Sequence, residues 1–123
     1  YKWHWRHIIR AMAQYPDNFF AIWTNAPLNQ SATNANAAML SKKFAAWAKD
    51  TLARGLDPEI GAMPPNIYIF DYFSKLTDPD GYQMLQYAAS GGDSHPNASV
   101  RSASCDPVRD GRATARWFDV PVP

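Results

Sequence analysis

Apolar residues near the start of the chain recur at the spacing of an amphipathic helix. They lie three or four positions apart, at Trp5, Ile8, Ile9 and Met12. This spacing puts them on one face of a helix. Pro16 disfavours helical backbone angles at the residue before it. The pattern therefore predicts a helix over residues 2–14.

Two later stretches, residues 19–23 and residues 66–70, are almost continuously apolar. A short apolar run without alternation is typical of a strand that is covered on both faces, as in a parallel sheet. We expect one strand at each position. Two strands alone do not make a stable sheet, so we also expect a complementary segment, or a second copy of the chain, to complete it.

A long amphipathic helix is predicted between these strands. Ser31 or Thr33 suits its N-cap, and Gly55 suits the position just after its C-cap. The expected apolar stripe consists of Leu40, Phe44, Trp47, Ala48 and Leu52. Strand, helix and strand together form one βαβ unit, which indicates an α/β fold with a parallel sheet.

A polar, glycine-rich segment follows at residues 90–97, with the sequence SGGDSHPN, after a short helical or extended piece at residues 82–89. It places Asp93 two positions before His95, and an imidazole beside a carboxylate is the base and its orienting acid in triad chemistry. The same residues also suit a plain polar turn, in which Asp93 and Asn97 cap local backbone donors. Both interpretations stay open at this point.

Over roughly residues 1 to 100, the order of these motifs resembles the C-terminal half of SGNH/GDSL-type ester hydrolases. The likeness rests on residues 19–27 (FFAIWTNAP), 32–36 (ATNAN), 66–73 (NIYIFDYF) and 93–97 (DSHPN). The last motif is the most specific. In that family the late loop supplies the catalytic histidine and aspartate, so the resemblance implies that His95 is the base and Asp93 its acid.

The chain departs from the family pattern in two ways. The common spacing is Asp-x-x-His, and Gly92 stands where that aspartate would be. The motifs of the N-terminal half, Gly-Asp-Ser-Leu and Gly-x-Asn-Asp, are absent. The tripeptide at residues 92–94 spells Gly-Asp-Ser, but it runs into His95-Pro96 rather than an apolar helix. We interpret it as a coincidence.

The resemblance implies a fold and an activity. The fold would be part of a three-layer α/β/α sandwich of the flavodoxin-like SGNH type, with the N-terminal half absent. Residues 1–123 would be one partial domain, with residues 101–123 a poorly defined tail. The activity would be hydrolysis of a small-molecule, carbohydrate or lipid ester, without a metal or organic cofactor. The serine and the oxyanion donors would come from the absent half.

Other residues give weaker indications. Asp71 ends the second strand and is the alternative acid, whereas Asn25 ends the first and either lines a cleft or caps a turn. His4 and His7 are three positions apart, but no further metal ligand is suggested nearby. The alternative hypothesis is that the chain is a non-catalytic domain that binds a sugar or a protein through exposed aromatic side chains. Those aromatics are Trp3, Trp5, Tyr82 and Tyr87.

Composition narrows these options. A chain of 123 residues forms one domain at most, and a 46% apolar share excludes a disordered chain. A net charge of +1 gives no long-range attraction to nucleic acid. No apolar run approaches the roughly 20 residues of a membrane span, and no leader is visible. Cys105 is the single cysteine, hence an unpaired thiol. The compartment stays open, with a secreted or cell-envelope location as one option.

Overall fold

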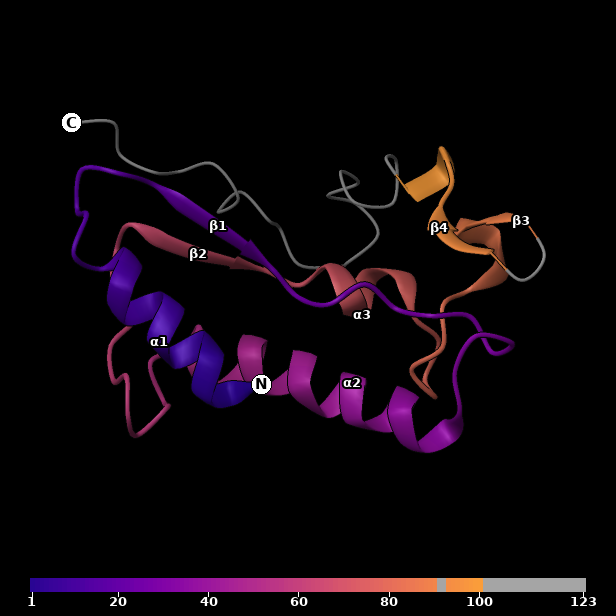
Figure 1. The fold of residues 1–123 in the computed structure, drawn as a ribbon, viewed down its shortest axis with the longest axis horizontal. Coiled ribbons are helices and arrows are strands. Elements are labelled where there is room, and N and C mark those ends of the chain that lie inside the picture. Colours follow the sequence, from indigo (N-terminus) through magenta and orange to yellow (C-terminus); the bar gives the residue numbers. More distant parts are fainter. Residues whose placement is uncertain (91–92, 101–123) are drawn as a thin grey trace.

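A computed structural model describes residues 1–90 and 93–100 of the chain. This part is a small mixed α/β structure (Figure 1). Its elements, in chain order, are α1 (Lys2–Met12), β1 (Phe20–Trp23), α2 (Ala35–Trp47), η1 (Ala48–Leu52), β2 (Ile67–Phe70), α3 (Tyr72–Leu76), η2 (Leu85–Tyr87), β3 (Ala88–Ser90) and β4 (Asp93–Pro96). The first helix and both apolar strands therefore lie within two residues of their predicted bounds.

The predicted parallel pairing of the two apolar strands is confirmed. β1 pairs with β2 in a two-stranded parallel sheet, with a register that runs from Phe20 opposite Ile67 to Trp23 opposite Phe70. Both long helices lie on the same side of this sheet (Figure 1). The main core forms where these helices pack on the sheet. It consists of Ile9, Trp47, Ala48, Leu52, Ile67 and Ile69. No full three-layer sandwich is present in residues 1–90 and 93–100.

The expectation that the first strand is covered on both faces is wrong. β1 alternates between half-buried and exposed residues, and Trp23 keeps 57% of its surface exposed. The reason is that α1 and α2 pack against one face, where Phe20 and Ile22 join the core. The continuous apolar run therefore hides a one-sided burial pattern.

α2 begins and packs somewhat differently from the prediction. Its N-cap is Asn34 rather than Ser31 or Thr33, and the Asn34 side chain accepts a hydrogen bond from the Ala37 N–H at 3.0 Å. Leu40 was expected in the core, but it is 55% exposed, because the buried face of α2 runs through Ala38 and Ala45 instead. α2 itself extends beyond the end of the sheet (Figure 1). Gly55 has the positive φ of 71° expected just after a helix end.

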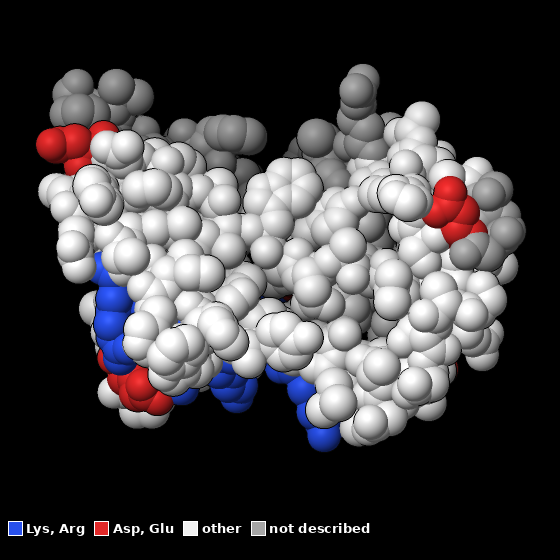
Figure 2. All heavy atoms as spheres, viewed as in Figure 1, with Lys and Arg blue, Asp and Glu red and all other residues white. Residues whose placement is uncertain are grey.

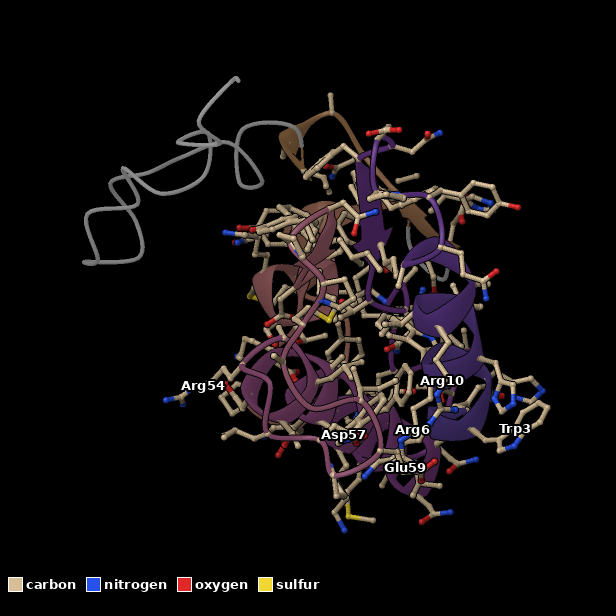
Figure 3. All side chains as sticks on the ribbon, turned by 90° about the vertical axis from the view of Figure 1, so that its left-hand side faces the viewer. Trp3, Arg6, Arg10, Arg54, Asp57 and Glu59 are labelled. Carbon is tan, nitrogen blue, oxygen red and sulfur yellow. The ribbon has the colours of Figure 1, made fainter. Side chains whose placement is uncertain are left out.

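A buried carboxylate joins α1 to the connection between η1 and β2. Asp57 is 1% exposed and accepts two hydrogen bonds from the Arg6 guanidinium, from Nε at 3.0 Å and Nη2 at 2.8 Å. It also accepts from the Trp47 indole at 3.2 Å and the Glu59 N–H at 3.1 Å. Figure 3 shows Arg6, Asp57 and Glu59 together between α1 and this connection. The Arg6 hydrogen bond lowers the pKa of Asp57 to about 2, although burial opposes the change.

Charged side chains are sparse on the face drawn in Figure 2, where Lys and Arg lie mainly along the lower, helical edge. This distribution places no broad basic patch on that face. Within the described part of the chain, the helices are too short or too polar to cross a membrane.

We predict that Arg6→Met lowers the free energy of unfolding by about 3 kcal/mol, because it leaves the buried Asp57 carboxylate without its cation. Arg10→Met is the matched control. Arg10 lies one turn along α1 and, among the described residues, pairs with the half-exposed Glu59, so its loss should cost less than about 1 kcal/mol. Urea unfolding followed by tryptophan fluorescence measures both values. Equal losses in the two variants would contradict the assignment of Asp57 as the critical partner.

Acid should remove the contribution of Asp57 to stability. The pKa of Asp57 falls from its ordinary value of 3.8 to about 2 in the folded chain. The contribution of this carboxylate to the free energy of unfolding is therefore complete above about pH 4 and is lost as the pH drops through about 2. The unfolding free energy of the natural chain should therefore decline over this window. Asp57→Asn should be less stable at neutral pH and show a shallower decline. Urea unfolding at a series of pH values measures both chains. If the free energy of unfolding declined equally in the natural chain and in Asp57→Asn, the decline would not come from Asp57.

Candidate functional site

Strand β4 brings the two candidate catalytic residues together. Alternate residues of a strand point to the same face, so Asp93 and His95 share one face of β4 (Asp93–Pro96). Their side chains meet in a hydrogen bond of 2.6 Å between His95 Nδ1 and Asp93 Oδ1. The backbone N–H of His95 also donates to Asp93 Oδ1, at 2.9 Å.

This pair is open to solvent, because the His95 side chain is 88% exposed and that of Asp93 is 43% exposed. The pKa of Asp93 lies below its ordinary value, first because of the hydrogen bond from the His95 backbone N–H and then because of the one from the ring. Since the ring uses Nδ1 toward the carboxylate, Nε2 is the nitrogen directed to other partners. The imidazole is thus held in one orientation through Nδ1.

Polar contacts anchor the hairpin that carries the pair. β3 and β4 are antiparallel. The Asn29 N–H donates to Ser94 Oγ at 2.9 Å. The side-chain amide of Asn97 donates to the carbonyl groups of Gln86 and Ala88, each at 2.8 Å. The residues that flank the hairpin, Tyr87 and Val100, belong to a second apolar cluster with Tyr72 and Leu76. The segment that was predicted as a loop thus forms a strand of an antiparallel hairpin, fixed by these hydrogen bonds. Gly92 lies outside the described residues.

The contacts expected of a polar turn and those expected of an imidazole–carboxylate pair are both present in this segment. Asp93 and Asn97 cap local donors as a polar turn would, and Asn97 Oδ1 accepts from the Ser99 N–H at 2.9 Å. The same Asp93 oxygen also holds the imidazole. A plain turn does not require the ring contact, so the segment forms the turn contacts and also holds the imidazole against a carboxylate.

Ser94 does not stand beside the imidazole. It is the residue between Asp93 and His95 in β4, so its side chain projects to the opposite face of the strand. There its hydroxyl accepts the hydrogen bond from the Asn29 backbone. This position supports the interpretation of residues 92–94 as a coincidental match to the nucleophile motif.

The alternative acid, Asp71, is engaged elsewhere. It caps α3 by accepting from the Ser74 N–H at 3.1 Å and pairs with Lys49 Nζ at 3.2 Å. The Thr24 hydroxyl lies 3.5 Å from the same carboxylate. Asp71 therefore joins the ends of β1 and β2 to η1, whereas Asp93 is the carboxylate that contacts His95.

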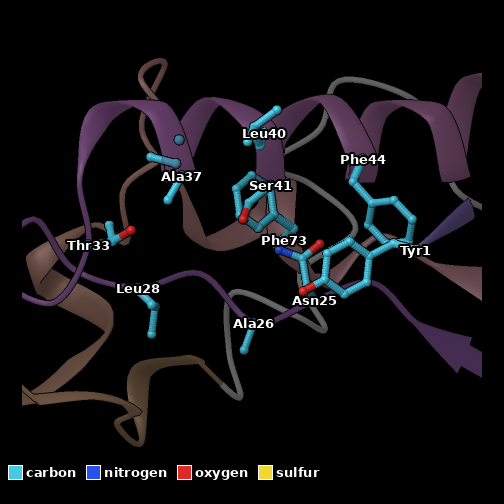
Figure 4. A pocket seen from close by; sticks show the side chains of 12 residues that line it. Tyr1, Asn25, Ala26, Leu28, Thr33, Ala37, Leu40, Ser41, Phe44 and Phe73 are labelled. Atoms are coloured by element: carbon cyan, nitrogen blue, oxygen red, sulfur yellow. The ribbon is translucent and has the colours of Figure 1, made fainter.

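The remaining sequence candidates fall at separate places. Asn25 lines a pocket beside α2 (Figure 4). His7 donates from Nδ1 to the Trp3 carbonyl at 2.8 Å, and His4 packs edge-on against the Trp3 ring. No group of three potential metal ligands gathers within residues 1–90 and 93–100. Cys105 and the tail from residue 101 lie outside the described residues.

Sequence reasoning missed Asn29, which supports the hairpin from the β1–α2 connection. Its side chain is 2% exposed. Its Oδ1 accepts from the Ser31 N–H, the Ser31 hydroxyl and the Ala32 N–H, which fixes the turn whose backbone N–H reaches Ser94. An Asn two residues before a Ser, just after Pro27, is a signal for such a turn.

Comparisons of the chain with protein-family models, curated proteins and solved structures found no match.

We predict that the carboxyl group of Asp93 titrates below the ordinary range of aspartate, since two hydrogen bonds stabilise its ionised form. In His95→Ala the pKa should rise only in part, because the backbone N–H of residue 95 still donates. Carboxyl ¹³C shifts recorded against pH measure both values. An Asp93 pKa at or above the ordinary value would show that the contact is not formed in solution.

Proposed function

We propose that this chain carries the histidine and aspartate of a serine ester hydrolase. The observation that supports the proposal is the 2.6 Å contact between His95 Nδ1 and Asp93 Oδ1, in which the imidazole is held by one nitrogen. Acyl transfer needs a base oriented in this way. The resemblance of residues 93–97 to the late motif of SGNH/GDSL-type hydrolases points to the same roles.

In the proposed mechanism, His95 Nε2 takes the proton of a serine hydroxyl as its oxygen attacks the ester carbonyl carbon. The imidazolium then gives this proton to the leaving alcohol as the carbon–oxygen bond of the ester breaks. Water attacks the acyl-serine in the second half-reaction, and His95 again carries the proton. Asp93 stays ionised throughout and stabilises the imidazolium.

The nucleophilic serine is proposed to lie outside these 123 residues, in a complementary segment or a second copy. Two features support this. Ser94, the serine next to His95, is directed to the other face of β4 and bonded to Asn29. The His95 ring is 88% exposed, so its Nε2 is accessible to an approaching segment.

The same proposal extends the two-stranded sheet to a three-layer α/β/α sandwich. Two parallel strands are too few for an independent sheet, and Trp23 leaves a large apolar surface in solvent. Further strands from the complementary segment would pair with this sheet and bring the serine to the carboxyl ends of the strands. Ligands bind at that edge in open α/β sheets.

A non-catalytic binding domain remains the alternative from another class. Of the four aromatics that the sequence suggested for it, Trp3 is 60% exposed, whereas Trp5 and Tyr82 are half-buried and Tyr87 is buried. Trp3 also stacks on His7, with ring centroids 3.9 Å apart. Trp3 is thus the one exposed residue of those four, so the surface that the sequence suggested for a sugar or protein partner is small, and the hydrolase is the better-supported proposal.

The test is turnover of p-nitrophenyl acetate by the complete protein. His95→Ala should lower kcat/KM by roughly 10²-fold to 10⁴-fold, because it removes the proton carrier. Asp93→Asn should lower kcat by a similar factor with little change in KM, since it disturbs the orientation of the ring. The isolated 123-residue chain should be nearly inactive.

His7→Ala is the matched control, because His7 is also exposed and also hydrogen-bonded through Nδ1, but on α1 and to a carbonyl group. Its turnover should stay within about twofold of the natural protein. Unchanged turnover in His95→Ala would remove His95 from the mechanism. Full His95-dependent activity in the isolated chain would instead show that the nucleophile is internal.

A further inference from the structure

The two-stranded sheet has an outer face, opposite the face on which both long helices pack (Figure 1). Successive residues of a strand point to opposite faces, so the outer face consists of Ala21 and Trp23 of β1 and Tyr68 and Phe70 of β2. Trp23 is 57% exposed, and Phe19, just before β1, is 60% exposed. An apolar surface of this kind gains free energy when another apolar segment covers it.

The described part of the chain ends beside this outer face. The Trp23 ring lies 4.9 Å from the Phe70 ring and 5.2 Å from the Tyr72 ring, measured between centroids. Tyr72 belongs to the second apolar cluster together with Val100, and Phe70 packs against that cluster. Val100 is the last residue of the described part and is 7% exposed. The segment that follows therefore starts next to the apolar surface.

The sequence after Val100 has a polar part and an apolar part. Residues 101–116 are the polar spacer, with four arginines and two aspartates, whereas residues 117–122 (WFDVPV) are mainly apolar. Phe118, Val120 and Val122 alternate with an aspartate and a proline, which is the pattern of an extended segment with one apolar face. A proline follows each of the two valines, and it disfavours helical backbone angles at the residue before it.

The polar spacer is long enough for residues 117–122 to reach the outer face. A flexible chain of this length has an average end-to-end distance of about 22 Å, whereas the four-residue strands of the sheet extend over about 13 Å. A segment tethered at this range has an effective concentration on the order of millimolar. This value favours the chain's own segment over a second copy, which is present only at its concentration in solution.

We propose that residues 117–122 pack on the outer face of the sheet, with their alternating apolar side chains against Ala21 and Trp23. The partner of this surface is then a segment of the same chain. The proposal does not depend on ester hydrolysis, because it requires neither His95 nor a nucleophile. It is also compatible with further strands at the edges of the sheet, because the segment lies on a face.

The test compares ¹H–¹⁵N spectra of the full 123-residue chain with those of two matched variants. Val120→Ser removes an apolar side chain from the segment, whereas Val108→Ser makes the same change in the polar spacer. We expect Val120→Ser to shift the signals of the Trp23 indole N–H and the Ala21 amide, because the segment then covers the face less often. Val108→Ser should leave both signals in place. Equal effects of the two variants on these signals would overturn the proposal.

A second measurement locates the segment directly. Nuclear Overhauser contacts between the Trp23 ring protons and the methyl groups of Val120 or Val122 should be present in the natural chain and should keep their intensity on dilution. Their absence would refute the proposed location. Contacts that weaken on dilution, and that also form between two differently labelled chains, would show that a second copy covers the face and would refute the intramolecular assignment.

Discussion

The buried Asp57 carboxylate is the interaction on which the arrangement of the main core depends. Its partners come from α1 (Arg6), α2 (Trp47) and its own connection (Glu59). A carboxylate this deeply buried is tolerated only with a cation and well-formed hydrogen bonds. Satisfying it therefore brings α1 against α2 on one side of the sheet, where Ile9 and Trp47 pack on Ile67 and Ile69. Trp23 is exposed because both helices pack on the other face of the sheet.

The candidate site depends on a second, smaller set of contacts. The hairpin formed by β3 and β4 is joined to the β1–α2 connection through Asn29 and Ser94, and Asn97 bonds it to the carbonyl groups of Gln86 and Ala88. That connection also forms one wall of the pocket that contains Asn25. The segment between β1 and α2 thus contacts the hairpin of the proposed catalytic pair and also lines the pocket.

What could be predicted from the sequence was mostly local. The helix at α1, both apolar strands and the closeness of Asp93 to His95 follow from spacings of a few residues. Asn34 was missed as N-cap because Ser31 and Thr33 are equally suited by type and stand only a few residues away. Arg6 and Asp57 lie 51 positions apart, and no local pattern records such a pairing. The one-sided burial of β1 was also hidden, because apolar residues such as Ala21 and Trp23 occupy its exposed positions.

We infer that Asp93 holds His95 by Nδ1, so that Nε2 carries no proton and can accept one. Long-range ¹H–¹⁵N correlation spectra of His95, recorded at a pH where imidazole is neutral, measure this directly, because the two ring nitrogens differ in shift when only one is protonated. We expect a proton on Nδ1 in the natural chain and its redistribution toward Nε2 in Asp93→Asn. A proton on Nε2 in the natural chain, unchanged by that substitution, would contradict it.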